Sequence, residues 1–404
     1  MQELSRRELM VLAGVGLAAA GCGSQDGTRR TSAGVTGGSG STQGAVPQAA
    51  DMTVAAPAKL TAPLLSSDVL VFSKDTLPKS TIEKIGAITG KDGEKAILAV
   101  EPMAVGQFYV DERQVTYAAV DPSTFWRFTV PGTAHTADVW KRVAGGEIAV
   151  QPEIGRELQT KDGYLKLGNG ADAAKAHVGA YAQLLDAGYA RQIDAVVNSK
   201  WAKPLGMQPG NAALIAMGAT SPQSIMKKLQ AAAGSGASIQ ILGANVDLSV
   251  AQTAVLTGGA VANKIGTFNY TANSNGSVNP DPAWVANYIR TEQMPIIGAV
   301  RGNRIMLPQL RGALNEVVAE GLSKSIYQYG GCYVPRFIAG TNTLSFHSFG
   351  TAIDLNVADN GRGTVGKMDR RVVQIFKQWG FAWGGDWHYT DPMHFELATL
   401  ARKT

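Results

Sequence analysis

Residues 345–356 read SFHSFGTAIDLN, and residues 383–397 read WGGDWHYTDPMHFEL. In the first string Asp354 lies between Ile353 and Leu355, so the alternation predicts a short strand that turns its carboxylate away from the apolar face. In the second string His394 and Phe395 alternate in the same way. Two neighbouring strands of this kind predict a sheet with one apolar face and one polar face.

The two strings also hold three of the five histidines of the chain. His347, Asp354 and His394 form a set that suits a catalytic zinc, which takes three protein ligands and keeps one position open. Gly350 allows a backbone conformation or a close approach that a Cβ would obstruct. Asp391 lies three residues before the last ligand and is a candidate general base.

The pattern Ser-x-His-x-x-Gly-x-Ala-x-Asp, followed by Asp-x-x-His-Phe-Glu, resembles the zinc D-alanyl-D-alanine carboxypeptidase family, specifically its VanY and phage-endolysin branch. The resemblance covers residues 284–400. It implies a zinc ion bound by His347, Asp354 and His394, with Asp391 as the general base. The reaction that it implies is hydrolysis of a peptidoglycan stem peptide.

The resemblance also implies residues that bind the substrate. Arg336 corresponds to an arginine that grips a substrate carboxylate, with a plain salt bridge as the alternative, and Ser345 matches the leading serine. We expect Trp387 to wall the cleft. His388 departs from the family pattern and is expected at the surface or behind a ligand, and Glu396 is a candidate to orient a ligand from behind.

The first residues of the chain predict export. Residues 1–21 combine a basic Arg6-Arg7 pair with an apolar segment too short to span a bilayer, and they resemble a twin-arginine signal. The string Ala19-Ala20-Gly21-Cys22 resembles a lipobox, although alanine stands where leucine is usual. We therefore expect a protein lipid-anchored through Cys22 on the outer face of the cytoplasmic membrane, facing the cell wall. The alternative is cleavage that leaves Cys22 as an ordinary thiol.

Composition divides the remainder of the chain. Residues 22–63 carry almost no large apolar side chains and predict a flexible tether. The rest exceeds one typical core, so we expect an α+β protein of two domains. We predict an interaction domain over residues 64–245, a connecting helix and linker over residues 246–283, and a zinc peptidase domain over residues 284–404. In the last domain we expect a central antiparallel sheet flanked by helices.

The front segment has mixed α and β patterns. Apolar runs at 69–72 and 114–120 predict strands, and residues 171–190 and 221–233 predict helices. The stretch that begins Thr116-Tyr117-Ala118-Ala119-Val120-Asp121-Pro122 and runs on to Gly168 resembles the extracytoplasmic core domain of MacB/FtsX-type transporter permeases. The alternative is an unrelated small α+β domain with glycine turns.

The net charge of the chain limits the classes of molecule that it is expected to bind. The net charge of +5 is spread without a basic run, which argues against nucleic acid and suits anionic cell-wall polymers or lipid head groups. We predict a zinc peptidase of peptidoglycan stem peptides, most specifically a D-Ala-D-Ala carboxypeptidase. Its alternatives are an L-Ala-D-Glu-type endopeptidase, a binding protein with a structural zinc, and an envelope lipoprotein whose front domain binds a transporter or cell-wall partner.

Overall fold

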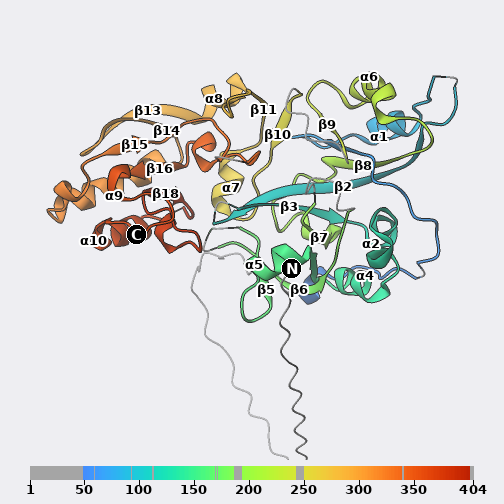
Figure 1. The fold of residues 1–404 in the computed structure, drawn as a ribbon, viewed down its shortest axis with the longest axis horizontal. Coiled ribbons are helices and arrows are strands. Elements are labelled where there is room, and N and C mark those ends of the chain that lie inside the picture. The colour runs from blue at the N-terminus through green and yellow to red at the C-terminus, as the bar shows by residue number, and fades with distance from the viewer. Residues whose placement is uncertain are drawn as a thin grey trace, which may run out of the picture. The chain divides into compact units, whose positions relative to one another are not determined.

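The computed structural model describes residues 49–400, apart from residues 59, 92, 112, 169, 171, 186–192, 243–249, 339 and 340. The predicted export signal, Cys22 and the predicted tether up to residue 48 lie outside the described residues. The described chain combines helices with four separate sheets, which agrees with the predicted α+β class (Figure 1). Among its helices none combines the length and the hydropathy that a membrane span requires.

The front part is built on a nine-stranded sheet with the order β5-β6-β4-β7-β3-β2-β8-β1-β9. Its strands are β1 (Val69–Phe72), β2 (Ile97–Val110), β3 (Arg113–Val120), β4 (Ile148–Val150), β5 (Tyr164–Lys166), β6 (Lys175–Tyr181), β7 (Ala195–Asn198), β8 (Ala212–Met217) and β9 (Ser238–Ile241). Neighbouring strands are antiparallel except for the pairs β3–β7 and β4–β6. The strands predicted at 69–72 and 114–120 are confirmed.

Helices pack on both faces of this sheet because its strands turn apolar side chains both ways. Val69 and Val71 of β1 lie in the core beneath α1 (Lys79–Gly86) and α6 (Pro222–Ala233), which confirms the predicted helix at 221–233. Leu70 and Phe72 lie in the core on the opposite face. That face carries α2 (Pro122–Phe125), α3 (Pro131–Ala134) and α4 (Ala137–Ala144), and α5 (Pro152–Leu158) follows β4.

The helix predicted over residues 171–190 is wrong where the structure describes it. Residues 175–181 form β6, which pairs with β4 on one side and β5 on the other. Alanine favours a helix locally, but the preference is worth less than about 1 kcal/mol per residue. Backbone pairing with two neighbouring strands overrides that preference.

Glu101 of β2 is a buried acid that should make stability depend on pH. Burial raises its pKa to about 7, and the hydroxyl of Thr124 donates to its Oε1 at 2.7 Å. The folded state therefore holds a proton that the unfolded chain releases near pH 4.5. The stabilisation is complete below pH 4.5 and is lost as the pH rises through about 7, by up to about 3 kcal/mol.

Glu101→Gln should flatten this dependence. Urea unfolding at pH 5 and pH 8 would measure it, with Glu83→Gln, a change at an exposed position of α1, as the control. We expect the free energy of unfolding of the wild type to fall between the two pH values by more than that of Glu101→Gln. Equal falls in the two proteins would contradict a protonated Glu101 in the folded state.

The segment predicted as a connecting helix and linker forms a small sheet instead. Its antiparallel strands are β10 (Gln252–Ala254), β11 (Phe268–Ala272) and β12 (Val278–Pro280), with α7 (Ala260–Ile265) between the first two. The polar run after β11 is a tight turn, in which the Asn273 N–H donates to the Ser277 carbonyl at 2.8 Å. Asn, Ser and Gly mark turns as readily as linkers, so composition alone does not distinguish the two.

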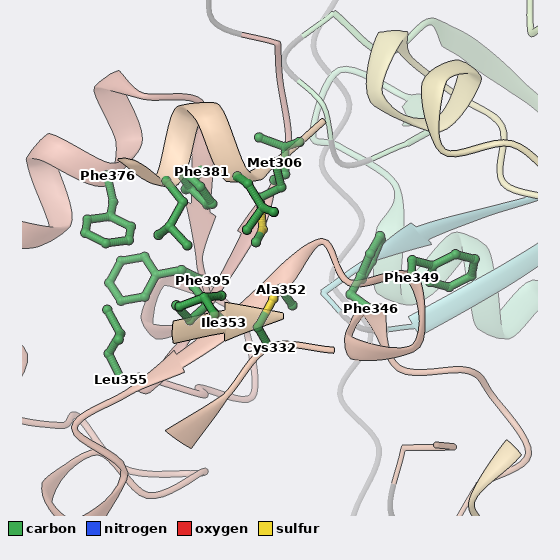
Figure 2. Close-up of a cluster of buried hydrophobic side chains, with 14 of the residues drawn as sticks. Met306, Cys332, Phe346, Phe349, Ala352, Ile353, Leu355, Phe376, Phe381 and Phe395 are labelled. Carbon is green, nitrogen blue, oxygen red and sulfur yellow. The ribbon is translucent and has the colours of Figure 1, made fainter. Parts of the chain in front are cut away.

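The C-terminal part contains the antiparallel sheet that the two strings predict. Its order is β15-β16-β18-β17. The elements are α8 (Pro282–Tyr288), β13 (Ile289–Met294), β14 (Gly298–Asn303), α9 (Leu307–Ala319), β15 (Tyr329–Gly331), β16 (Ala352–Leu355), α10 (Arg370–Gln378), β17 (Phe381–Trp383) and β18 (His394–Leu397). Phe376 of α10 packs on Phe395 and Phe381, with ring centroids 4.6 and 5.4 Å apart (Figure 2).

The structure bears on the predicted domain division and on the predicted end of the tether. Residues 46–404 form one compact unit, so their division into two domains stays a prediction. Met52 falls within the predicted tether, yet it is buried, and Asn198 Nδ2 donates to its carbonyl oxygen at 2.7 Å. Ordered packing therefore begins before residue 63.

Candidate metal centre

The register of two strands creates the candidate metal centre. Asp354 of β16 pairs directly with His394 of β18, so both side chains project from the same face. Glu396 lies two residues further along β18 and shares that face. Ile353 and Phe395 form the next pair and point the opposite way, into the core drawn in Figure 2. The alternation in the sequence thus separates a dry face from a polar one.

His347 reaches the same place from the short 3₁₀-helix η5 (Phe346–Phe349). The Ser345 hydroxyl oxygen caps this helix by accepting the His347 N–H at 3.3 Å. Gly350 ends it in the left-handed region, with φ of 66°, and a Cβ there would lie 2.9 Å from the Asn303 nitrogen. Gly350 therefore meets both the conformation and the close approach that the sequence suggests.

The three predicted ligands meet in space. His347, Asp354 and His394 offer ligand atoms that all lie within 4.8 Å of one another, and they form the single group of this kind in the described part of the chain. The Asp354 carboxylate lies between the imidazoles, 3.2 Å from His347 Nε2 and 3.2 Å from His394 Nδ1. Both histidines are buried.

Partners behind the two imidazoles fix which nitrogen faces the centre. His347 Nδ1–H donates to the Cys332 carbonyl oxygen at 2.8 Å, so Nε2 faces Asp354. His394 Nε2–H donates to Glu396 Oε2 at 3.2 Å, so Nδ1 faces Asp354. Such outer partners commonly fix the tautomer of metal-ligating histidines. Glu396 thus has the orienting contact expected from the sequence.

The donor set fits a divalent cation. His347 Nε2 is buried without a hydrogen-bond partner, because its 3.2 Å approach to Asp354 lacks hydrogen-bond geometry. Such an atom is costly unless something binds it, and a cation supplies that contact. Burial alone would raise the pKa of Asp354, but His347 and His394 outweigh burial and hold that pKa well below its ordinary value. A carboxylate and two imidazole nitrogens suit zinc.

Asp391 is held in a tight turn beside this cluster. It is buried, its N–H donates to the Gly384 carbonyl at 2.8 Å, and the His394 N–H donates to its carbonyl at 3.0 Å. Gly384 permits this approach, since a Cβ there would lie 2.4 Å from the Asp391 carbonyl oxygen. Trp383 Nε1 donates to the Pro392 carbonyl at 2.8 Å and secures the same loop. The predicted base is therefore positioned by backbone contacts.

Arg336 is tied to the segment that carries His347. Its N–H donates to Ser348 Oγ at 2.9 Å, and the Ser348 hydroxyl donates back to its carbonyl at 2.7 Å. Its guanidinium Nη1 donates to the Phe337 carbonyl at 3.2 Å, and it makes no ion pair with any described residue. The alternative of a plain salt bridge therefore finds no partner among them.

The remaining predicted residues occupy different places. Trp387 is buried, with its ring centroid 5.2 Å from that of His394, so it walls the cluster. Ser345 is buried and caps η5, and its contact with substrate stays a prediction. His388 is exposed and does not join the cluster, as expected.

Two contacts to the centre carry no sequence signal. The first is the Cys332 carbonyl, because a backbone atom is present in every residue type. The second is the β2–β3 hairpin, whose Tyr109 ring centroid lies 4.8 Å from that of Phe346, and whose Asp111 carboxylate lies near the His388 backbone N–H. The hairpin lies so far away in sequence that no local pattern connects it with the centre.

Glu396→Gln should weaken metal binding by about 10–100-fold, the usual cost of losing an outer partner of a ligand. The amide keeps the size of the side chain but removes the charge that polarises His394. Competition with a chelator would measure zinc affinity, and Glu320→Gln, exposed at the end of α9, is the control. Equal affinities for the two variants would rule out this role for Glu396.

The comparisons with known proteins bear on the C-terminal part. No curated protein matches the chain, and the resemblance of the front segment to transporter domains finds no support. One family model matches residues 339–397, a segment that contains the three cluster residues and Asp391 and begins after Arg336. The match supports a metallopeptidase that acts on cell-wall peptides. Residues 339–397 match the model of a family described as D-alanyl-D-alanine carboxypeptidase, which confirms the resemblance carried by the two strings.

Proposed function

We propose that the protein is a zinc-dependent D-Ala-D-Ala carboxypeptidase of peptidoglycan stem peptides. The observation that carries the proposal is the buried cluster of His347, Asp354 and His394, whose imidazoles are oriented from behind by Cys332 and Glu396. It lies within the segment that matches the carboxypeptidase family. A purely structural zinc would require four protein ligands, and the cluster offers three.

Zinc in this cluster would polarise a peptide carbonyl and lower the pKa of a water molecule toward about 7. The three ligands bring one formal negative charge, from Asp354. With zinc bound, His347 and His394 would each offer an unprotonated nitrogen, since the other nitrogen of each ring has an acceptor in the Cys332 carbonyl or Glu396. The chain would thus leave half of the charge of a divalent ion for the substrate and the attacking water.

Asp391 supplies the proton transfers. Its carboxylate accepts a proton from the attacking water, and it returns that proton to the nitrogen of the leaving amino acid as the peptide bond breaks. The product is a shortened peptide with a new carboxylate and a free amine. The backbone bonds from Asp391 to Gly384 and His394 keep this carboxyl at a constant place relative to the ligands.

Arg336 suits a substrate with a free carboxylate beside the bond that is cut. A terminal D-Ala carries a free carboxylate, and a guanidinium binds a carboxylate through two parallel hydrogen bonds. Arg336 makes no ion pair with a described acid, so its charge is available to such a group. The second candidate is cleavage of the L-Ala-D-Glu bond inside the stem peptide, where the free α-carboxylate of the γ-linked D-Glu would suit the same guanidinium.

The setting of the enzyme is part of the proposal. The Arg6-Arg7 pair, the apolar segment after it and Cys22 support export and lipid anchoring on the outer face of the cytoplasmic membrane. A tether rich in Gly, Ser and Thr would let the enzyme reach the cell wall from that anchor. Binding of an envelope protein by the front part stays a prediction.

Mass spectrometry of peptidoglycan fragments tests the proposal. The zinc-loaded full chain would be incubated with disaccharide pentapeptide, beside an Asp391→Ala protein as the control. We expect loss of the terminal D-Ala only with the wild type. A cut between L-Ala and D-Glu would establish the endopeptidase, and bound zinc without any cleavage would refute both reactions.

A further inference from the structure

A cavity of about 750 Å³ lies between the nine-stranded sheet, the three-stranded sheet and the segment just before η5. Small-molecule sites typically have volumes of about 300–1,000 Å³. None of the three cluster residues lines the cavity, so it is distinct from the metal centre. Its walls come from β1, β2, β3, β9, β10 and β11, together with residues 341–344 and Arg362.

The cavity wall is a polar continuation of an apolar sheet face. Met103 and Val105 of β2 belong to the core that α2 and α4 cover, and Gln107, next on the same face, lines the cavity. Ala118 of β3 lies in that core, and Thr116 lines the cavity. The face changes from apolar to polar where the cavity begins, as expected for a site that binds a polar ligand.

Several polar side chains of the wall are buried and held in place. Gln240 Nε2 donates to Gln252 Oε1 at 3.1 Å and to Ser238 Oγ at 3.3 Å. Gln252 Nε2 donates in turn to the Val250 carbonyl at 3.1 Å. Gln240 is 7 % exposed, and these bonds fix the side chain in the cavity wall. The wall thus presents polar groups whose positions are set before a ligand binds.

The charges of the wall balance. Its carboxylates are Asp111 and Asp194, and its guanidinium groups are Arg113 and Arg362. Arg113 forms an ion pair with Glu157 outside the cavity, and Asp194 Oδ2 accepts the Thr116 N–H at 2.9 Å. The other polar lining groups are amides and hydroxyls. The wall therefore suits a neutral ligand with many hydroxyl and amide groups better than it suits a polyanion. Tyr270 adds an aromatic ring of the kind that packs on the apolar face of a sugar.

The cavity reaches the loop that carries the predicted base. The Asp111 carboxylate at its rim lies near the His388 backbone N–H, which counteracts the rise that burial causes in its pKa. Arg362, also at the rim, lies over the Tyr389 ring at 5.4 Å from the centroid. His388 and Tyr389 precede Asp391 in the same loop. A ligand that fills the cavity can therefore continue toward the metal centre.

We infer that this cavity binds the saccharide part of the substrate, as neutral N-acetylated hexosamine units, while the attached peptide extends to the metal centre. The inference rests on the proposed function for the identity of the attached peptide. Such sugars carry hydroxyl and acetamido groups and no charge, which matches the amide, hydroxyl and aromatic wall. The front part then selects substrates that are still joined to the glycan.

Isothermal titration of the metal-free protein with tri-N-acetylchitotriose tests the inference without any need for hydrolysis. Gln240→Met combined with Asn342→Leu removes polar groups from the wall at nearly constant volume. Gln223→Met with Asn279→Leu makes the same changes outside the cavity and is the matched control. We expect the cavity variant to bind about tenfold more weakly than the wild type and the control.

Asn342→Leu alone, at an exposed position on the rim, keeps the test valid if the double variant fails to fold. Loss of affinity in this single variant would again support the cavity. Absence of chitotriose binding to the wild type, or equal binding by both double variants, would overturn the inference. A protein that binds chitotriose yet cuts no peptide would support the cavity and refute the proposed reaction, so the two failures can be told apart.

Discussion

Asp391→Asn should lower kcat for removal of the terminal D-Ala by about 10²–10⁴-fold, because an amide cannot accept the proton of the attacking water. Zinc content should stay unchanged, because Asp391 is not one of the three clustered ligands. The asparagine keeps the shape of the side chain, and the backbone bonds to Gly384 and His394 do not depend on the carboxylate. Mass spectrometry of the product and metal analysis of the protein measure the two effects.

The matched control is Asp386→Asn, in the same loop. Asp386 is exposed and pairs with Lys377 Nζ at 2.6 Å, so its loss should leave kcat nearly unchanged. A large fall in kcat for Asp386→Asn, together with normal kcat for Asp391→Asn, would make Asp386 the general base instead of Asp391. Loss of zinc from Asp391→Asn would instead make this residue a fourth ligand.

His347→Ala should remove zinc and activity together. The substitution deletes the Nε2 donor of the cluster and leaves the Cys332 carbonyl without its hydrogen bond from Nδ1. Loss of a direct ligand should cost more than the about 10–100-fold in affinity that loss of an outer partner costs. Metal analysis after dialysis and the cleavage assay should therefore show near-zero values for this variant.

His388→Ala is the control for a histidine in the same region. Its side chain is exposed and lies outside the cluster, so zinc content should match that of the wild type. Circular dichroism of both variants separates loss of metal from loss of fold. A folded His347→Ala protein that retains stoichiometric zinc would contradict the assigned ligand set.

The metal centre could be predicted because its signals are local. The alternation around Asp354 and His394 fixes the faces of β16 and β18, and the two strands turn out to be direct neighbours. The glycine at 350 marks the turn between the first two ligands. Ligand type, spacing and strand period all agree here, so short strings contain enough information.

The surroundings of the centre depend on contacts between segments that are distant in sequence, and a local sequence pattern does not predict such contacts. The Cys332 carbonyl and the β2–β3 hairpin act through backbone geometry and packing, which leave no pattern in a local stretch. Residues 175–181 pair as a strand although their composition favours a helix. The sheet of β10, β11 and β12 has short strands and a polar turn, which composition cannot distinguish from a linker.

The hairpin of β2 and β3 limits how far the chain can be truncated without loss of core packing in its C-terminal part. Tyr109, near the tip of the hairpin, is buried in the same core as Phe346, Phe349 and Leu397. A fragment that begins after residue 283 would leave that aromatic pocket empty beside the helix that carries His347. The segment that matches the carboxypeptidase family therefore depends on the front sheet for part of its core, and it is not expected to keep the same packing when expressed alone.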